Sequence, residues 1–320
     1  MPTAVESDLT LLVRQLRWES EGVVSVVLEN ADGSALPAWE PGAHVDLHLP
    51  GSIVRQYSLC GSPDRSGQWR VGVLREESGR GGSAAVHEKV RPGTVIAARG
   101  PRNNFVLRPS AAYVFIAGGI GITPILSMVA AADAAGAQWS LLYGGRTRPS
   151  MAFIDELAAY GDRVLIHPQD ELGLLPLGEV LRDPRPGTLV YCCGPEPLLR
   201  AAEEATAAWP AGSLVVERFV PLPVDPAVSA NDTTFTVEAA ASGVTVAVPA
   251  GTTIVKALEA VGIFPPVSCE EGICGTCETT VLGGIPDHRD SLLSEAEQDE
   301  GKTMMICVGR ARGDRLVLDL

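Results

Sequence analysis

Residues 269–277 read CEEGICGTC and place Cys269, Cys274 and Cys277 in the spacing C-x4-C-x2-C. A fourth cysteine, Cys307, follows further along the chain. A [2Fe–2S] cluster needs four thiolates to hold its two irons, and this spacing is the one used around plant-type clusters. The sequence therefore predicts a [2Fe–2S] cluster bound by these four cysteines.

The residues around these cysteines favour a cluster over zinc. Gly272 and Gly275 allow the loop backbone to wrap close to the inorganic sulfides and to donate N–H groups to them. A four-cysteine zinc site is the alternative, but such sites usually use two C-x2-C pairs, and this chain has one. The remaining cysteines, Cys60, Cys192 and Cys193, lack ligand spacing. An odd total of seven without a secretory signal also argues against a disulfide framework.

Composition narrows the class of protein. The chain has 320 residues, 46% of them apolar, which predicts two or three domains with real cores. Its net charge of −14 argues against binding to nucleic acid or to an anionic membrane, because both need patches of Lys and Arg. Residues 1–10 show no signal peptide, so we expect a cytoplasmic protein. We also expect a monomer. Residues 109–132 carry no charge, but their glycines favour a strand, a turn and a helix over a membrane span.

The first segment, residues 1–105, alternates short apolar runs with turns. Regular short strands of this kind predict a small antiparallel β-barrel. The predicted strands are Leu9–Leu16, Val23–Leu28, Val45–Leu49, Arg55–Leu59, Trp69–Leu74 and Val95–Ala98.

In the second segment, residues 106–222, strands alternate with helices, which predicts a doubly wound α/β domain with a parallel sheet. The predicted strands are Tyr113–Ala117, Trp139–Tyr143, Arg163–His167, Thr188–Cys192 and Leu214–Phe219. The predicted helices are Pro124–Ala135, Met151–Tyr160 and Glu196–Trp209.

The last part of the chain predicts a third domain. Residues 220–232, VPLPVDPAVSAND, contain three prolines and no periodicity, which is typical of a linker. Residues 233–320 predict an α+β, β-grasp-like domain with two strands, a helix at Thr253–Val261, the cysteine loop and further strands.

This third domain is also acidic. It holds 13 Asp and Glu against six Lys and Arg, and Glu270, Glu271 and Glu278 lie in or beside the cysteine loop. Their concentration favours docking to a basic partner where electrons leave, although each carboxylate alone fits a solubilising role.

Two motifs in the first segment favour a flavin site. RQYSL at residues 55–59 supplies an Arg that can grip phosphate, a Tyr that can cover one flavin face and a Ser that can hydrogen-bond the ring edge near N5. GRGGS at residues 79–83 precedes a predicted helix, and its small residues expose backbone N–H groups that suit a phosphate. Each motif alone also fits strand packing or a glycine turn, but together they favour flavin. The expected flavin residues are Arg55, Tyr57, Ser58, Leu59, Gly81, Gly82 and Ser83.

Two glycine motifs in the second segment favour a nicotinamide dinucleotide. AGGIGITP at residues 117–124 lies between a predicted strand and a helix, where glycines let the backbone approach a pyrophosphate. It departs from the full G-x-G-x-x-G pattern, because a proline occupies the place of the third glycine. CCGP at residues 192–195 ends a later strand and alone also fits small buried residues. The expected residues are Gly118, Gly119, Gly121, Thr123, Pro124, Cys193, Gly194 and Pro195.

The order of these motifs resembles the phthalate dioxygenase reductase and vanillate demethylase reductase family over essentially the whole chain. RQYSL, GGIGITP and CCGP are similar to the R-x-Y-S-[LI], G-G-x-G-[IV]-T-P and C-G-P motifs of the wider ferredoxin-reductase superfamily, and residues 233–320 resemble a plant-type ferredoxin domain. The resemblance implies FMN, a choice over FAD that the residues alone leave open. It places Cys193 beside the nicotinamide ring and Phe219 near the flavin. With Ser58, these are the expected catalytic residues.

The resemblance also implies NADH as the electron donor. Arg146 and Arg148 follow the strand that should reach the adenosine ribose, where they could bind a 2′-phosphate and favour NADPH, or simply be solvated. We expect NADH.

The predicted sites form one chemical sequence. A nicotinamide delivers hydride, a [2Fe–2S] cluster accepts one electron at a time, and a flavin can do both. We therefore expect an NADH-dependent iron–sulfur flavoprotein reductase, which the resemblance links to a terminal Rieske-type aromatic oxygenase or O-demethylase. A cytochrome P450 partner is one alternative, and a flavin and cluster sensor without turnover is another, which the nicotinamide motifs argue against. The chain has no Rieske C-x-H pair and no haem-thiolate signature, so we do not expect it to hydroxylate a substrate itself.

Overall fold

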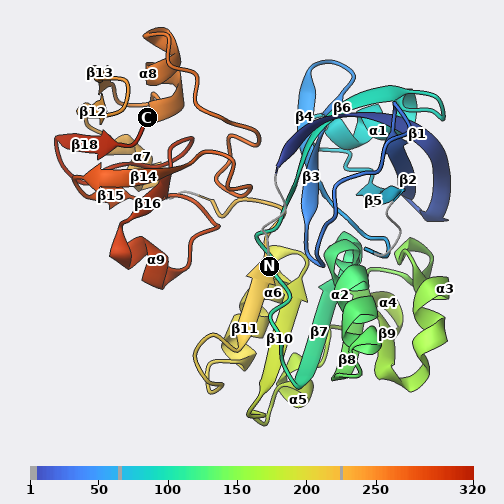
Figure 1. Ribbon diagram of the computed structural model, residues 1–320. Helices are drawn as coiled ribbons and strands as arrows, with labels where there is room; N and C mark the ends of the chain where they lie inside the picture. Colours follow the sequence, from blue (N-terminus) through green and yellow to red (C-terminus); the bar gives the residue numbers. More distant parts are fainter. Residues whose placement is uncertain (1–5, 64–66, 224–225) are drawn as a thin grey trace. The chain divides into compact units, whose positions relative to one another are not determined.

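The structure is a computed structural model that describes residues 6–63, 67–223 and 226–320. The chain divides into two compact units, Met1–Glu217 and Arg218–Leu320 (Figure 1). The expectation that no signal peptide is present falls partly on residues 1–5, outside the described residues. Within the described ranges, no helix is both long and apolar enough to cross a bilayer.

Six antiparallel strands form the predicted barrel, in the order β4-β3-β6-β1-β2-β5. A bridge between Leu59 and Val71 joins the two ends of the sheet, so the barrel closes. Helix α1, Gly82–Lys89, packs on the barrel core through Ala85 and Val86. The strands are β1 (Ser7–Ser20), β2 (Val23–Asn30), β3 (His44–Leu49), β4 (Ile53–Ser58), β5 (Trp69–Leu74) and β6 (Val95–Arg102).

The rest of the first unit is the predicted parallel sheet, in the order β11-β10-β7-β8-β9 (Figure 1). The chain starts at the central strand β7 and continues outward through β8 and β9. It then returns to the other side of β7 through β10 and β11, so the switch point lies between β7 and β10. The strands are β7 (Ala112–Gly118), β8 (Gln138–Gly145), β9 (Val164–Pro168), β10 (Thr188–Cys193) and β11 (Leu214–Glu217).

Helices cover both faces of this sheet. One core joins α2 to alternate residues of β7 such as Phe115, while a second core joins α5 and α6 to the intervening residues such as Ile116. The uncharged residues 109–132 thus form a strand, a glycine turn and a helix, as predicted. The helices are α2 (Ile122–Ala134), α3 (Ile154–Leu157), α4 (Gln169–Leu172), α5 (Leu177–Val180) and α6 (Glu196–Ala205), with short 3-10 turns η1 (Gly119–Gly121), η2 (Arg148–Ser150) and η3 (Ala158–Arg163).

The prediction of one helix over Met151–Tyr160 is wrong. Phe153 has a φ of 63°, so a helix cannot pass through it, and only the short α3 and η3 follow. The Phe153 ring lies 5.1 Å below the Arg70 guanidinium and against Gly72 of the barrel. Tertiary contacts therefore outweigh the helix propensity of this stretch.

Two other predicted elements are too long. Helix α6 ends at Ala205 instead of Trp209; the Trp209 amide donates to the carbonyl of Thr206 in a turn, and its indole nitrogen donates to the carbonyl of Leu181 at 2.9 Å. Strand β11 ends at Glu217, two residues before Phe219. Helices α4 and α5 were not predicted, since each has only four residues.

The second unit contains the predicted α+β domain, built on a mixed sheet in the order β13-β12-β18-β14-β16. Strands β12 and β18 are parallel, and the other pairs are antiparallel. Helix α8, Ile254–Ala260, starts where the Thr253 hydroxyl accepts the Lys256 amide at 3.2 Å. The strands are β12 (Phe235–Ala239), β13 (Val244–Val248), β14 (Glu278–Gly283), β15 (Pro286–Asp287), β16 (Thr303–Met305), β17 (Arg310–Ala311) and β18 (Arg315–Leu318), and the last helix is α9 (Glu295–Glu300).

The predicted linker is more ordered than its composition suggests. A short helix, α7, forms at Pro226–Ala230 within residues 220–232. Residues 224–225 of the predicted linker lie outside the described residues.

Candidate functional site

The structure brings the four predicted cluster cysteines together. Each is at most 4% exposed, and none forms a disulfide. Cys269 interacts through its thiol with Cys274 and Cys307, and Cys307 also interacts with Cys277. Three of them lie on the loop between α8 and β14, while Cys307 follows β16. Four buried thiols thus converge from two distant segments, as a [2Fe–2S] cluster requires.

The loop backbone also fits a cluster. Gly272 has a φ of 72°, and a Cβ there would lie 3.0 Å from the backbone of Asp290. The Glu271 amide donates to the sulfur of Cys269 at 3.3 Å. Both sulfur and backbone are therefore arranged as cluster ligands need them.

The predicted phosphate groups of the flavin site lie side by side. Arg55 on β4 donates to the Arg80 carbonyl at 2.8 Å. A Cβ at Gly82 would lie 2.5 Å from Cγ of Arg55, so only glycine lets this side chain cross the start of α1. Gly81 begins that helix with a φ of 81° and no side-chain cap, and Ser83 accepts a hydrogen bond from the Glu76 amide. An Arg and a helix N-terminus together suit a phosphate monoester.

Of the other residues in the RQYSL motif, Tyr57 and Ser58 belong to the predicted flavin site and Leu59 belongs to the barrel core. Burial raises the pKa of Tyr57 to about 12, so its half-buried ring stays a neutral phenol. Ser58 is 5% exposed at the end of β4. Leu59 is fully buried in the barrel core, where its backbone closes the barrel onto Val71.

The two glycine motifs of the nicotinamide site interlock at the switch point of the sheet. A Cβ at Gly118 would lie 2.6 Å from Leu198 and 2.8 Å from Pro195, and a Cβ at Gly121 would lie 2.3 Å from the carbonyl oxygen of Cys193. Gly119 has open space on its side. Ligands of open α/β sheets bind at the carboxyl ends of the strands beside such a switch point.

Thr123 connects this edge of the sheet to the barrel. Its hydroxyl donates to the carbonyl of Ile120 at 3.0 Å, at the start of α2. Its methyl group would lie 2.8 Å from a Cβ at Gly72 on β5, which itself borders β4 through the closure of the barrel. Pro124, in the first turn of α2, is buried. The predicted flavin strand, β4, therefore borders β5, which is the barrel strand that packs on the predicted nicotinamide site.

Cys192 and Cys193 point to opposite faces of the sheet. Both are fully buried, but Cys192 belongs to the core under α6 and Cys193 to the core under α2. The Cys193 thiol donates to the Glu217 carboxyl across 3.9 Å, from β10 to the facing residue of β11. Burial raises the pKa of Cys193 well above its ordinary value and that of Glu217 to about 8, so both groups are mainly neutral at pH 7.

The sequence alone assigns no role to Glu217. The signal that could have found it is its position opposite Cys193 at the carboxyl end of the neighbouring strand. Phe219 follows β11 in the second unit and is 37% exposed, so its predicted role near the flavin stays a prediction.

Known protein families match both the cluster site and the nicotinamide site. Residues 237–312 match the family described as a 2Fe-2S iron–sulfur cluster binding domain, and residues 115–167 match the oxidoreductase NAD-binding domain. The chain is 40% identical to the phenoxybenzoate dioxygenase subunit beta of Ectopseudomonas oleovorans over 99% of both proteins. It is 38% identical to a vanillate O-demethylase oxidoreductase of Pseudomonas sp., over 98% of this chain and all of that one.

Solved structures agree. Phthalate dioxygenase reductase superposes with a TM-score of 0.72 at 33% identity, over 98% of both chains. An intact type IV self-sufficient cytochrome P450 monooxygenase superposes with a TM-score of 0.92 at 43% identity over 98% of this chain, which spans 41% of that longer protein. Full-length relatives and the fold agree with the glycine and cysteine sites, and the chain belongs to the phthalate dioxygenase reductase family of iron–sulfur oxidoreductases.

Proposed function

We propose that this chain takes hydride from NADH and passes the electrons through FMN and a [2Fe–2S] cluster to a terminal oxygenase. The observation that carries the proposal is the contact between Thr123 and Gly72, which packs the start of α2 against the barrel beside the predicted flavin strand. Phthalate dioxygenase reductase is itself described as a modular structure for electron transfer from pyridine nucleotides to [2Fe–2S].

In this proposal, Arg55, Gly81, Gly82 and Ser83 hold the flavin phosphate at the start of α1. The neutral Tyr57 ring covers one face of the flavin, and the Ser58 hydroxyl hydrogen-bonds the reacting edge. When bound, the flavin accepts a hydride and releases its electrons singly, as the change from nicotinamide to cluster requires. FMN is favoured over FAD by the family to which the chain belongs.

The nicotinamide dinucleotide lies along Gly118, Gly119 and Gly121 in this proposal, with its ring beside Cys193. The neutral pair of Cys193 and Glu217 then borders the ring without placing a full charge beside it. NADH is favoured over NADPH by the family to which the chain belongs, and Arg148 already pairs with Glu171 at 3.7 Å.

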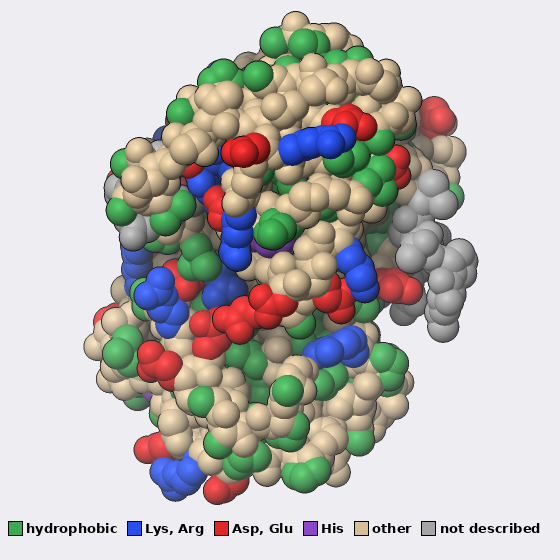
Figure 2. Space-filling view, turned by 90° about the vertical axis from the view of Figure 1, so that its left-hand side faces the viewer, with side chains coloured by type: hydrophobic (Ala, Val, Ile, Leu, Met, Phe, Trp, Pro, Cys, Tyr) green, Lys and Arg blue, Asp and Glu red, His purple; other side chains and the backbone are tan. Residues whose placement is uncertain are grey.

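The electrons leave through the cluster unit to an oxygenase. The dioxygenase and demethylase names of the full-length relatives favour a Rieske-type oxygenase or O-demethylase. A cytochrome P450 is the second candidate, since the P450 structure contains a segment 43% identical to this chain. Acidic side chains form a band across the face drawn in Figure 2, which suits a basic partner.

The proposal divides the chain into a flavin domain at residues 1–105, a nicotinamide domain at 106–222 and a ferredoxin domain at 233–320. A cytoplasmic location agrees with the seven cysteines, all within the described residues, because none of them forms a disulfide and a reducing compartment keeps thiols reduced. We propose a monomer, which analytical ultracentrifugation tests.

The decisive experiment has two parts. Flavin released by heat is expected to chromatograph as FMN, and FAD would refute that assignment while leaving the reductase intact. Addition of NADH without oxygen is expected to bleach flavin and cluster absorption in turn, whereas a protein that NADH leaves unchanged would be a sensor. Ser58→Ala is expected to slow flavin reduction more than it weakens flavin binding, because its hydroxyl acts at the reacting edge.

A further inference from the structure

The segment that follows β8 contacts the barrel at two places. At the first, the amide of Glu21 in the turn between β1 and β2 donates to the carbonyl of Pro149 in η2 at 2.9 Å. At the second, Phe153 and Glu156 meet Arg70 of β5. Both contacts lie within the first compact unit and join the proposed flavin domain to the proposed nicotinamide domain.

Arg70 bonds to both sides of this junction. Its two terminal nitrogens donate to the two carboxylate oxygens of Glu156, and the Nη2 bond measures 2.9 Å. Nη2 also donates to the backbone carbonyl of Cys60 in the barrel at 2.6 Å. The Arg70 side chain is 20% exposed. An arginine that binds a carboxylate through both nitrogens fixes its orientation as well as its distance, so Arg70 holds α3 in a defined place against the barrel.

The same guanidinium holds the Phe153 ring. Its central carbon lies 5.1 Å from the centre of that ring, within the range of a cation–π contact. Phe153 has a φ of 63°, and such a left-handed backbone persists for a bulky residue only where its surroundings fix it. The ring also lies against Gly72, where a Cβ would come within 3.1 Å of it, and Gly72 is the residue that meets Thr123 at the start of α2. Arg70 therefore supports the contact between the barrel and the predicted nicotinamide site.

Arg70 also lies beside the end of the predicted flavin strand. Its neighbour Val71 forms the bridge to Leu59, the residue after Ser58. The amide of Cys60 donates to the Arg70 carbonyl at 2.9 Å. A displacement of Arg70 is therefore passed directly to the strand end that carries the predicted flavin residue Ser58.

We propose that Arg70 is a positioning residue for hydride transfer, because it fixes the nicotinamide domain against the end of the flavin strand. In this step NADH becomes NAD⁺ by giving up one proton and two electrons as a hydride, which the flavin takes up. Arg70 acts on this step through Glu156 and Phe153 and not by touching the reactants. A misplacement of the reactants by about 1 Å lowers the rate about a hundred-fold. This inference rests on the proposed path from NADH to flavin.

The test compares Arg70→Ala with Arg163→Ala in the full-length holoprotein. Arg163 is a matched control, because it also pairs with a carboxylate, that of Asp133 at 2.5 Å, and also lies over an aromatic ring, that of Trp139 at 4.4 Å. These three residues all belong to the nicotinamide domain. Both variants are therefore expected to lose stability in urea unfolding, but only Arg70→Ala loses a contact between the two domains.

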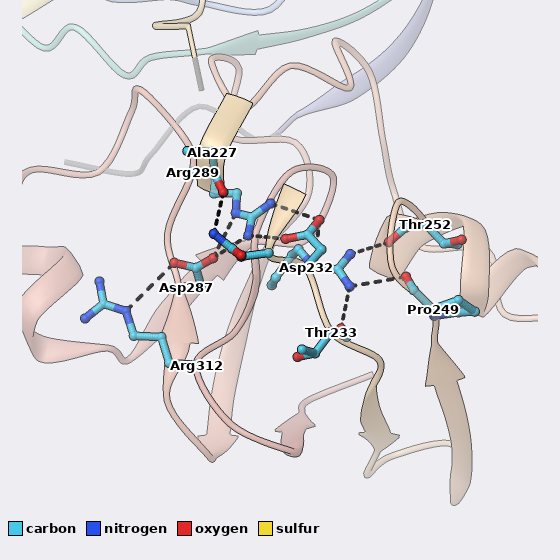
Figure 3. A network of polar contacts seen from close by, with 10 residues as sticks. Ala227, Asp232, Thr233, Pro249, Thr252, Asp287, Arg289 and Arg312 are labelled. Atoms are coloured by element: carbon cyan, nitrogen blue, oxygen red, sulfur yellow. Dashed lines mark hydrogen bonds and ion pairs between the residues drawn. The ribbon is translucent and has the colours of Figure 1, made fainter. Parts of the chain in front are cut away.

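A second control comes from the other compact unit. Arg289 donates to both carboxylate oxygens of Asp232, at 2.6 and 3.3 Å, in the network of Figure 3. Arg289→Lys therefore loses a two-point bond of the same kind as Arg70→Lys does, away from the flavin and nicotinamide domains. It is expected to leave flavin reduction unchanged.

The rate measurement follows flavin absorption after rapid mixing with NADH over a range of concentrations. At saturating NADH, Arg70→Ala is expected to reduce its flavin about ten- to a hundred-fold more slowly than the unmodified protein. Its dissociation constant for NADH is expected to stay unchanged, because the proposed binding glycines lie on the parallel sheet. Arg70→Lys is expected to recover part of the rate, since lysine keeps the charge but not the two-point bond. Arg163→Ala is expected to keep the normal rate.

Hydrogen exchange gives a measurement that needs no turnover. The Glu21 amide reports on the junction, because its partner Pro149 belongs to the other domain. Arg70→Ala is expected to lower the protection of this amide, and Arg163→Ala is expected to leave it normal. The double variant Arg70→Ala/Glu156→Ala is expected to reduce flavin no more slowly than Arg70→Ala, since the two side chains act as one unit.

Four results would overturn the proposal. Equal slowing in Arg70→Ala and Arg163→Ala would show that lost stability explains the rate, and weaker NADH binding would show that Arg70 supports the binding site. A normal rate in Arg70→Ala or normal protection of Glu21 would show that the junction does not depend on Arg70. If Arg70→Ala fails to fold, Arg70→Lys against Arg163→Lys decides the same question. Failure of NADH to reduce the flavin of the unmodified protein would instead refute the proposed function, and the exchange of Glu21 would still decide whether Arg70 holds the junction.

Discussion

Replacing Cys193 by alanine is expected to slow hydride transfer without unfolding the protein. Cys192 is a matched control, because the two thiols are adjacent on β10 and equally buried. Strand alternation sends only Cys193 to the face that carries Glu217 and the start of α2. The pair of variants therefore separates chemistry from packing.

The expected magnitudes follow from this geometry. Each change removes one buried sulfur, so each is expected to cost about 1 kcal/mol of unfolding free energy through lost transfer energy and a small cavity. Cys193→Ala also removes the side chain that is proposed to border the nicotinamide ring. A misplacement of the ring by about 1 Å corresponds to about a hundred-fold loss of rate, or roughly 2.7 kcal/mol of activation free energy.

The assay is rapid mixing of each variant with NADH, read as loss of flavin absorption, beside urea unfolding. Cys193→Ala is expected to show a rate lowered about ten- to a hundred-fold with normal flavin and iron content. Cys192→Ala is expected to keep the normal rate and to lose only stability. The reverse pattern would assign the site to the other thiol, and equal rates in all three proteins would refute a role for either.

Four further predictions follow from the described residues. Purified protein is expected to contain about two irons and two acid-labile sulfides per chain, and zinc without sulfide would refute the cluster. Gly121→Ala is expected to cost about 1–3 kcal/mol of unfolding free energy and to weaken NADH binding, because its Cβ would meet the backbone of Cys193. Gly119→Ala has open space around its Cβ and is expected to cost only the roughly 1–2 kcal/mol of a left-handed backbone. Similar NADH binding by the two variants would contradict the interlocking of the two glycine motifs. Since burial raises the pKa of Glu217 to about 8, its contribution to stability is full below its ordinary pKa and is lost as pH rises toward 8; Glu217→Gln is expected to flatten this loss in urea titrations, and an unchanged pH profile would argue against it. A chain ending at Glu217 is expected to reduce ferricyanide with NADH but not to reduce cytochrome c efficiently, and full activity of this short chain would place the electron outlet at the flavin. The intact protein is expected to transfer electrons to its partner more slowly at high salt, because salt screens the exposed Glu270 and Glu278 over about 10 Å at 0.1 M ionic strength.

The sequence predicted most of the fold because its signals were local. All six barrel strands and all five parallel strands formed where apolar runs ended at turn residues. The cysteine loop was equally explicit, since ligand spacing follows directly from the geometry of the cluster. The RQYSL and GRGGS motifs were correctly paired, and Arg55 indeed crosses the start of α1 at Gly82.

The errors arose where distant residues decide the local conformation. The helix predicted at Met151–Tyr160 breaks at Phe153 because the barrel residues Arg70 and Gly72 hold its ring. The linker looked irregular because two residues that hydrogen-bond to its Leu222 and Asp232, Ser291 and Arg289, lie more than fifty residues further along the chain. Glu217 carried no motif, and only the pairing of β10 with β11 brings it to Cys193.

The glycines at the carboxyl end of β10, rather than the Cys193 thiol, distinguish this strand end as a proposed dinucleotide site. A small buried cysteine at a strand end fits any sheet, and Cys192 is such a residue on the opposite face. What distinguishes Cys193 is Gly194, where a Cβ would lie 3.0 Å from the backbone of Gly118 on the neighbouring strand. A side chain at Gly194 would force the backbone of Gly118 or the side chain of Leu198 to shift where the dinucleotide is proposed to bind, while the Cys193 thiol itself is kept. Gly194→Ala is therefore expected to weaken NADH binding more than Cys193→Ala does, and Cys193→Ala to slow hydride transfer more than Gly194→Ala does. A common effect of both variants on the two measurements would mean that this strand end acts as one packing unit without a separate role for the thiol.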